Sequence, residues 1–227
     1  MSATDQIRTA VLSRIRSALG VTGGEPARKA VVEIRLAYHP RGTIPARARG
    51  NRKGLIDLMT AVLNSQGAEV SRAGTAADAV RVIAEDLSAH GLPSALRMGG
   101  DPLLAALPWD GAPALQQRIG RAEPMDRAAL SRAIVAAAET GTLFLASGAD
   151  NPTTLAFLPE AHFILVDARD IVGSYEDAFD RLRALYGEGK LPRTVNLISG
   201  PSRTADIEQT IVRGAHGPKR LHVVILG

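Results

Sequence analysis

The chain of 227 residues contains no cysteine, and this absence excludes several kinds of chemistry. Without thiols the chain has no disulfide, no thiolate nucleophile, no thiolate zinc site and no cysteine-ligated iron–sulfur cluster. Aromatic residues are also scarce, at 4%, whereas the hydrophobic content of 45% and the charged content of 22% are ordinary for a globular protein. Any electron transfer through thiolate-bound clusters must therefore take place in another protein.

Long hydrophobic runs are missing as well. No apolar stretch approaches the roughly 20 residues that a membrane-spanning helix needs. The first residues, MSATDQIRTAVLSRIRSALG, spread their arginines and include an acid, unlike a secretory signal peptide. We therefore expect a cytoplasmic protein with no membrane association.

Positive charge is concentrated at the N-terminus. Residues 1–53 hold eleven Lys and Arg against three Asp and Glu, whereas the remainder holds sixteen against twenty. Residues 4–19 predict an amphipathic helix that Gly20 ends, and the prolines in 20–53 indicate an extended arm with one short strand at 31–36. Because the arm lacks interleaved aromatic residues, we expect it to contact solvent or a protein rather than nucleic acid.

From residue 54 onward, helices and strands alternate. We predict strands at 69–72, 94–98, 142–146, 162–166, 194–199 and 221–226, and helices at 55–66, 75–87, 127–139, 175–186 and from Ala205. The apolar run 194–199 is expected to be covered on both faces. This pattern predicts an α/β domain over 54–227, with a doubly wound, mostly parallel sheet and helices on both faces.

In such sheets a ligand binds beyond the carboxyl ends of the strands. Three polar loops are expected at those ends, namely Gly99 to Asp101, Ser147 to Asn151 and Gly200 to Thr204. The chain has no GxxxxGK[ST] and no GxGxxG motif, so a nucleotide cofactor is not indicated.

Two segments near the C-terminus resemble a known family. ISGPSRTADIE at 198–208 and GAHGPKRLHVVIL at 214–226 resemble the C-terminal signature of the lactate utilisation protein C family, the LUD-domain proteins. RIRSALG at 14–20 and AAETGTLFLAS at 137–147 also match. The resemblance implies a fold similar to sugar-phosphate isomerases and CoA transferases. It further implies a part in oxidising L-lactate to pyruvate together with iron–sulfur partner proteins.

The loop at 200–204 is the first candidate site. Its hydroxyls and backbone N–H groups, with Arg203 beside them, can cradle an anion, or they can simply cap a strand-to-helix turn. Asp206 and Glu208 already supply negative charge there, which disfavours a phosphate, and the resemblance favours a small carboxylate. The predicted substrate-binding residues are Gly200, Ser202, Arg203, Thr204 and Asp206, with Asp101, Asp150 and Asn151 as further loop candidates.

His216 is the candidate catalytic residue. As a general base or acid it suits removal of a hydroxyl or Cα proton from a 2-hydroxy acid, although a turn histidine that bonds a backbone carbonyl is the commoner case. His222 is expected to be structural. The five histidines show no metal-binding spacing, so no metal is predicted unless distant loops assemble a site. A triad of Ser202, His216 and Asp206 is rejected because no GxSxG motif is present.

Two other functions stay open. One is a stand-alone transferase or isomerase, for which Glu139, Asp206 or Glu208 would have to be the catalytic carboxylate. The other is a non-catalytic scaffold or binding module, for which the basic arm would contact an acidic partner or nucleic acid. Activity of the isolated protein on sugar phosphates or acyl-CoA would favour the first of these alternatives.

Overall fold

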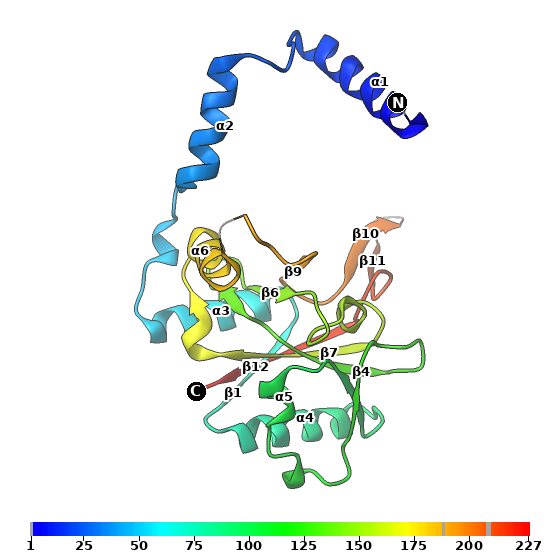
Figure 1. Cartoon of the computed structure of the whole chain (residues 1–227). Helices are drawn as coiled ribbons and strands as arrows, with labels where there is room; N and C mark the ends of the chain where they lie inside the picture. Colours follow the sequence, from blue (N-terminus) through cyan, green and yellow to red (C-terminus); the bar gives the residue numbers. More distant parts are fainter. Residues whose placement is uncertain (1, 188, 208–209) are drawn as a thin grey trace. The chain divides into compact units, whose positions relative to one another are not determined.

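The computed structural model describes residues 2–187, 189–207 and 210–227, without the side chains of 205–207 and 210–212. The chain forms two compact units, Met1–Thr43 and Ile44–Gly227 (Figure 1). The predicted boundary after residue 53 lies inside the second of these units.

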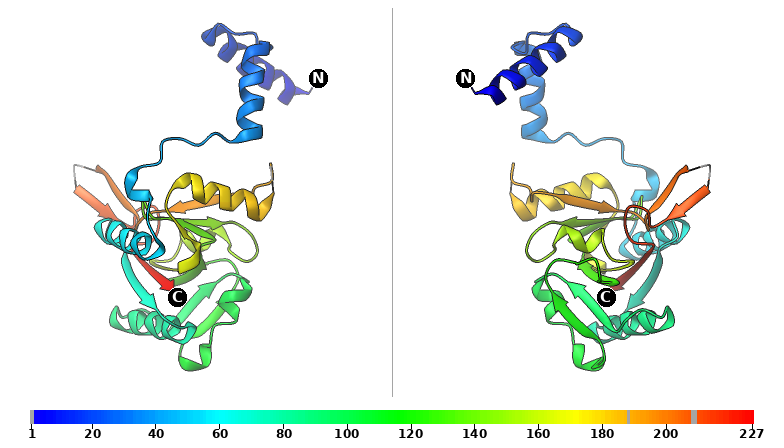
Figure 2. Two further views of the ribbon diagram at one scale, coloured as in Figure 1. Left: turned by 90° about the vertical axis from the view of Figure 1, so that its left-hand side faces the viewer. Right: turned by 90° about the vertical axis from the view of Figure 1, so that its right-hand side faces the viewer.

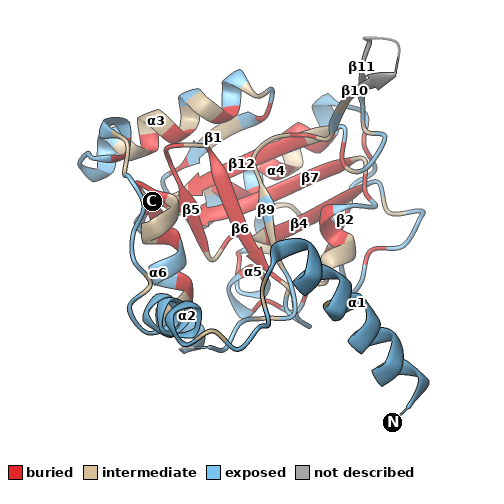
Figure 3. Cartoon of the chain, turned by 90° about the horizontal axis from the view of Figure 1, so that it is seen from above, coloured by how far each residue is buried: buried red, intermediate tan, exposed pale blue. Residues whose placement is uncertain are grey.

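The first unit consists of two helices, α1 (Ala3–Leu19) and α2 (Pro26–Tyr38). Gly20 ends α1 with a φ of 63°, which confirms the helix predicted at 4–19. The prediction of an extended arm with a short strand at 31–36 was wrong, because helix α2 occupies this stretch. Pro26 stands in its first turn, where the missing N–H costs nothing. Neither helix buries a residue, as the exposed colouring in Figure 3 shows.

The second unit is built on a six-stranded sheet with strand order β1-β12-β7-β4-β2-β3. All neighbouring strands in this sheet are parallel, which confirms the predicted mostly parallel α/β fold. The strands are β1 (Glu69–Ala73), β2 (Ala95–Met98), β3 (Gln116–Ile119), β4 (Ala128–Arg132), β7 (Ala161–Asp167) and β12 (Arg220–Leu226).

A smaller sheet has the strand order β8-β5-β6-β9, and β10 and β11 form a separate hairpin. In the smaller sheet β5 is parallel to β8, whereas β6 runs antiparallel to both β5 and β9. The strands are β5 (Val135–Ala137), β6 (Thr142–Ala146), β8 (Ile171–Val172), β9 (Val195–Ile198), β10 (Arg203–Ile207) and β11 (Thr210–Arg213).

The helices and short 3-10 turns complete the layers of this unit. They are η1 (Ala46–Ala48), α3 (Arg52–Ser65), α4 (Ala76–Ala89), α5 (Pro102–Ala105), η2 (Trp109–Gly111), η3 (Thr153–Ala156), η4 (Ala168–Asp170) and α6 (Tyr175–Tyr186). Thr75 and Ser174 cap α4 and α6 through capping boxes, which confirms the predicted starts of both helices. None of the described helices is both long and apolar enough to cross a membrane.

Alternating strand residues divide the core into layers. Phe163 of β7 faces the core under α4, whereas its neighbour Ile164 faces the core that contains α3 and the smaller sheet. Phe144 of β6 points the other way, towards α6. Figure 2 accordingly shows α4 and α6 on opposite outer sides of this unit.

The prediction of an alanine-rich helix at 127–139 was wrong, since strands β4 and β5 occupy that stretch. Residues 128–131 and 135–138 are all buried, so the chain is enclosed on both faces rather than along one helical stripe. Small alanine side chains allow this close packing between neighbouring layers. High helix propensity was overridden by tertiary burial.

Two predictions near the C-terminus were also wrong. The helix expected from Ala205 is the hairpin of β10 and β11, whose segments are rich in threonine, isoleucine and valine, residues that favour strands. The strand at 194–199 is β9, but it lies at the edge of the smaller sheet rather than between two layers. Leu197 is 44% exposed.

Candidate functional site

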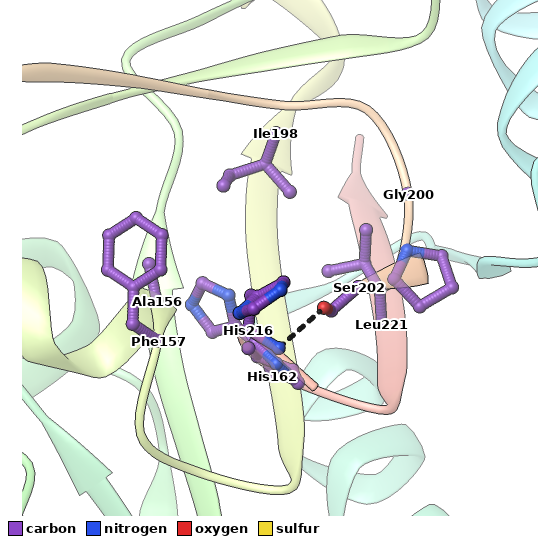
Figure 4. A pocket seen from close by; sticks show the side chains of 11 residues that line it. Ala156, Phe157, His162, Ile198, Gly200, Ser202, His216 and Leu221 are labelled. Carbon is purple, nitrogen blue, oxygen red and sulfur yellow. Dashed lines mark hydrogen bonds between the residues drawn. The ribbon is translucent and has the colours of Figure 1, made fainter. Parts of the chain in front are cut away.

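Residues 200–202 and 216–218 line one cavity of about 200 Å³, which we name the C-terminal cavity (Figure 4). Its lining consists of Ala156, Phe157, His162, Ile198, Gly200, Pro201, Ser202, His216, Gly217, Pro218 and Leu221. His162 and Leu221 are each the second residue of their strand, so the cavity lies at the amino ends of β7 and β12. The ligand crevice predicted from the sequence was expected beyond the carboxyl ends of the strands, which is the opposite end of the sheet.

The hairpin explains why these two segments meet. Arg203 pairs with Arg213 where the hairpin opens, which brings the residues before β10 close to those after β11. The backbone N–H of Ser202 donates to the Pro218 carbonyl at 2.8 Å, and the N–H of His216 donates to Ser202 Oγ at 3.3 Å. Because this hydroxyl oxygen accepts from the backbone, its own O–H remains able to donate to a ligand.

His162 contributes a buried polar group to this cavity. Its Nε2 atom lies 2.9 Å from Ser131 Oγ, and only 1% of the residue is exposed. Burial lowers the pKa of His162 to about 3, because the charged imidazolium loses its hydration. His162 is therefore a neutral hydrogen-bonding group at neutral pH. The sequence offered one signal for it, a histidine inside the apolar run of β7.

His216 lies at the exposed side of the same cavity. Figure 4 shows its side chain and that of His162 in the same part of the cavity, with Ser202 nearby. One histidine is thus buried and neutral, and the other is exposed to solvent. Such a pair can orient a small polar molecule and move a proton at one of its atoms.

Arg203 does not line the cavity. Its guanidinium donates to the Gln66 carbonyl and covers Gly67, in the turn between α3 and β1. Thr204 is not among the lining residues either. Glu208 and the side chain of Asp206 lie outside the described residues. Among the described lining residues there is no lysine, arginine or carboxylate.

The loops at 99–101 and 147–151 do meet. The N–H of Gly100 donates to the Ala149 carbonyl at 3.3 Å, and a Cβ on Gly99 would lie 2.0 Å from the Asp150 carbonyl oxygen. The loop at 200–204 is apart from them, because β9 is antiparallel to β6. Thr194 bonds to Ser147 at one end of this pair, and Ser199 lies beside Thr142 at the other.

Three of the remaining candidates have side-chain contacts within the fold, whereas Asp150 is exposed. Asp101 is buried, caps α5 through the N–H of Leu103 at 2.8 Å, and accepts from Arg132 Nε at 2.8 Å. The Asn151 amide donates to the Ala146 carbonyl at 3.2 Å. Glu139, one of the three carboxylates proposed for a stand-alone transferase or isomerase, accepts from the N–H of Tyr175 at 2.8 Å. These contacts give Asp101 and Glu139 partners without a ligand, whereas the Oδ1 atom of Asn151 is buried with no hydrogen-bond partner among the described residues. The roles of these residues in binding stay predictions.

A larger cavity of about 490 Å³ lies at the carboxyl ends of β4 and β7. Three arginines line it, and each is paired with an aspartate. The pairs are Arg132 with Asp101 at 2.8 Å, Arg169 with Asp167 at 3.0 Å, and Arg181 with Asp170 at 2.9 Å. Since every positive charge is already matched, this cavity has little surplus charge with which to attract an anion.

Comparison with known proteins gives consistent matches. The family model of the LUD domain matches residues 56–226. An uncharacterised protein of Neisseria meningitidis is 40% identical over 89 residues, which cover 39% of this chain and 37% of that protein. Lactate utilization protein C of Deinococcus radiodurans is 36% identical over 112 residues, or 46% of this chain and 51% of that protein. Lactate utilization protein C of Bacillus subtilis is 34% identical over 90 residues, or 39% of this chain and 38% of that protein.

The matched segments therefore span between about a third and half of these relatives' own length. Among solved structures, a DUF162 family protein from Deinococcus radiodurans superimposes with a TM-score of 0.57 at 22% identity. The superposition covers 79% of this chain and 100% of that chain. At this identity the likeness concerns the fold.

Proposed function

The chain belongs to the LUD domain family, and on that premise we propose that it is a component of a lactate utilisation system that binds a small 2-hydroxy or 2-oxo carboxylate in the C-terminal cavity. Relatives named lactate utilization protein C support the system. The observation that carries the binding site is the meeting of Ser202, His162 and His216 in one cavity with otherwise apolar or glycine lining.

The size and lining of this cavity suit a small organic acid. Its volume of about 200 Å³ is below the roughly 300–1,000 Å³ of sites for drug-sized ligands. Phe157 and Leu221 offer apolar contacts to a methyl group, while the Ser202 hydroxyl and the His216 imidazole can donate to carboxylate oxygens. This binding mode does not require an arginine, and none is present among the described lining residues.

Oxidation of a 2-hydroxy acid removes two protons and two electrons. In our proposal His216 accepts the hydroxyl proton, because it is the lining histidine that is exposed to solvent. The Cα hydrogen leaves with its bonding electron pair to an acceptor outside this chain, so that both hydrogens and both electrons are accounted for. Since the chain has no cysteine, we propose that iron–sulfur partner proteins supply that acceptor.

An isomerase or transferase acting alone has less support. Such an enzyme needs a carboxylate at its site, and none lines the described part of the C-terminal cavity. Glu139 instead holds the start of α6 through the N–H of Tyr175.

Calorimetric titration with lactate, pyruvate and a sugar phosphate tests the proposal. We expect saturable binding of lactate or pyruvate, weakened about 10- to 100-fold in His216→Ala, because a hydrogen bond to a charged group is worth about 1.5–3 kcal/mol. Ser202→Ala should weaken binding by a similar factor of about 10- to 100-fold, because its hydroxyl also donates to the charged carboxylate.

Arg203→Gln is the matched control from the same loop. Its guanidinium contacts the Gln66 carbonyl and not the cavity, so the affinity should be unchanged. Loss of binding in Arg203→Gln with retention in His216→Ala would contradict the assignment of the site. Binding of the sugar phosphate alone would instead support the isomerase.

A further inference from the structure

Five polar side chains meet where the C-terminal end of α4 packs against the amino ends of β1 and β12 (Figure 1). They are Glu69, Asp86, His90, Arg220 and His222, which we name the Asp86 cluster. Glu69 begins β1, Arg220 begins β12, and Asp86 and His90 are one helical turn apart. The cluster is separate from the C-terminal cavity, with which it shares no residue.

Asp86 has one engaged oxygen and one without a partner. Its Oδ1 atom lies 3.1 Å from Arg220 Nη2, 3.2 Å from His222 Nδ1 and 3.4 Å from His90 Nδ1. The same Nδ1 atom of His90 lies 2.9 Å from the Asp86 backbone carbonyl, to which it donates, so Nε2 is the nitrogen that is left for a ligand role. The side chain of Asp86 is only 7% exposed. Its Oδ2 atom is buried and has no hydrogen-bond partner among the described residues. Buried carboxylate oxygens are normally satisfied, so this orphan indicates that a positively charged or donating group belongs there.

His222 gives an independent indication. Its Nε2 atom lies 2.9 Å from Ser71 Oγ, and its Nδ1 atom is buried, faces Asp86 and has no hydrogen-bond partner within the described parts of the chain. If Nε2 carries the proton, the lone pair on Nδ1 points at a carboxylate oxygen only 3.2 Å away. A cation beside these two atoms would turn that repulsion into attraction.

We propose that the Asp86 cluster binds one divalent transition-metal ion of the zinc class, with Glu69, Asp86 and His90 as ligands and His222 beside them. The ligand atoms of the first three residues lie within 4.8 Å of one another. A mixed set of imidazole nitrogen and carboxylate oxygen suits Zn²⁺ and its neighbours, whereas Mg²⁺ and Ca²⁺ prefer oxygen alone.

Arg220 uses one nitrogen on the two carboxylates, and its Nη1 atom is buried with no hydrogen-bond partner among the described residues. Its Nη2 atom holds Oε1 of Glu69 at 2.7 Å and Oδ1 of Asp86 at 3.1 Å, so the second oxygen of each carboxylate is still available. One guanidinium balances only one of the two carboxylates. The side chains of Glu69 and His90 are 51% and 39% exposed, which gives an ion a route from solvent.

Such an ion would tie the end of α4 to β1 and β12 and stabilise the folded state by binding to it. Full-length protein is stripped with a chelator, desalted and titrated with Zn²⁺ by calorimetry. The zinc-loaded protein is then desalted again, and the zinc that it retains is measured. We expect one equivalent per chain, a rise in the thermal midpoint, and no displacement by millimolar Mg²⁺.

Two variants on the same helix make the test specific. His90→Ala removes a half-exposed ligand and should weaken zinc binding at least about tenfold while the fold is kept. Glu85→Gln removes the neighbouring, 63% exposed carboxylate and should leave the affinity unchanged. Glu69→Gln serves as a second ligand variant, because Glu69 is 51% exposed, whereas Asp86 is buried and Asp86→Asn can prevent folding.

Three results would overturn the assignment. The first is wild-type protein that has been saturated with Zn²⁺, is desalted a second time and then retains no stoichiometric zinc. The second is equal affinity in His90→Ala, Glu69→Gln and Glu85→Gln. The third is zinc binding that is lost in His216→Ala instead, which would locate the ion at the C-terminal cavity.

Discussion

The buried His162 makes the stability of the fold depend on pH in a way that can be calculated. Burial holds its pKa at about 3 in the folded state, against 6.5 for the ordinary side chain. Between these two values the unfolded chain binds the proton and the folded chain does not, so the free energy of unfolding rises with pH across this window. Stability is complete above pH 6.5 and is lost as the pH falls towards 3.

The size of this effect follows from the two pKa values. Each pKa unit corresponds to 1.36 kcal/mol, so the difference of about 3.5 units amounts to about 5 kcal/mol in total. Only part of this loss falls in an accessible range. At pH 5 the unfolded histidine is almost fully protonated, and the folded state should have lost about 2 kcal/mol relative to pH 8.

Urea denaturation at pH 5 to 8, on wild type and His162→Gln, isolates this contribution from that of other groups. A glutamine amide can replace Nε2 in the contact with Ser131 and does not titrate. The advantage of wild type over the variant should therefore shrink by about 2 kcal/mol between pH 8 and pH 5. His39→Asn is the control, since His39 lies in the unit Met1–Thr43 outside the described core, and it should keep the wild-type pH dependence. Parallel curves for wild type and His162→Gln would refute a neutral, buried His162.

Two further predictions concern the loops and caps. Gly99→Ala would bring a Cβ to 2.0 Å from the Asp150 carbonyl oxygen and should cost about 1–3 kcal/mol in thermal unfolding, whereas Gly148→Ala, with nothing within 4 Å, should change stability by less than about 0.5 kcal/mol. Ser174→Ala removes the capping box of α6 and should cost about 1 kcal/mol. Ser2→Ala removes the capping box of α1, which buries no residue, and should leave the main unfolding transition unchanged. Equal effects within either pair would contradict the reasoning.

Local signals in the sequence were sufficient for much of the fold. The starts of α4 and α6 were predictable because Thr75 and Ser174 are followed three residues later by an aspartate that completes each capping box. The parallel sheet followed from the alternation of these helices with short apolar runs such as β7 and β12. In these segments the local preference of the chain agrees with its tertiary environment.

Other segments were predicted wrongly because their local and tertiary preferences differ. Residues 128–138 are rich in alanine, the best helix former, yet they are enclosed by neighbouring strands and helices as β4 and β5. Residues 203–213 begin with hydroxyl and acidic residues that are typical of a helix start, yet they pair as a hairpin. For β4 and β5 no local pattern distinguishes the outcomes, since the deciding contacts come from residues far along the chain. In the hairpin, threonine, isoleucine and valine were a local signal for strands that competed with the signal for a helix start.

The same reasoning explains what could be predicted of the candidate site. Ser202 and His216 were identified because they belong to unusual segments, and the β10–β11 hairpin brings those segments together at the amino ends of β7 and β12. His162 was passed over, because a single histidine in an apolar strand is ordinarily structural, and only the register of β7 beside β12 brings it to the cavity. Arg203 had the charge expected of a carboxylate ligand, but in an edge hairpin its long side chain reaches the carbonyl of Gln66 instead. Sequence therefore identifies residues with suitable chemistry, whereas strand direction and register decide which of them share a site.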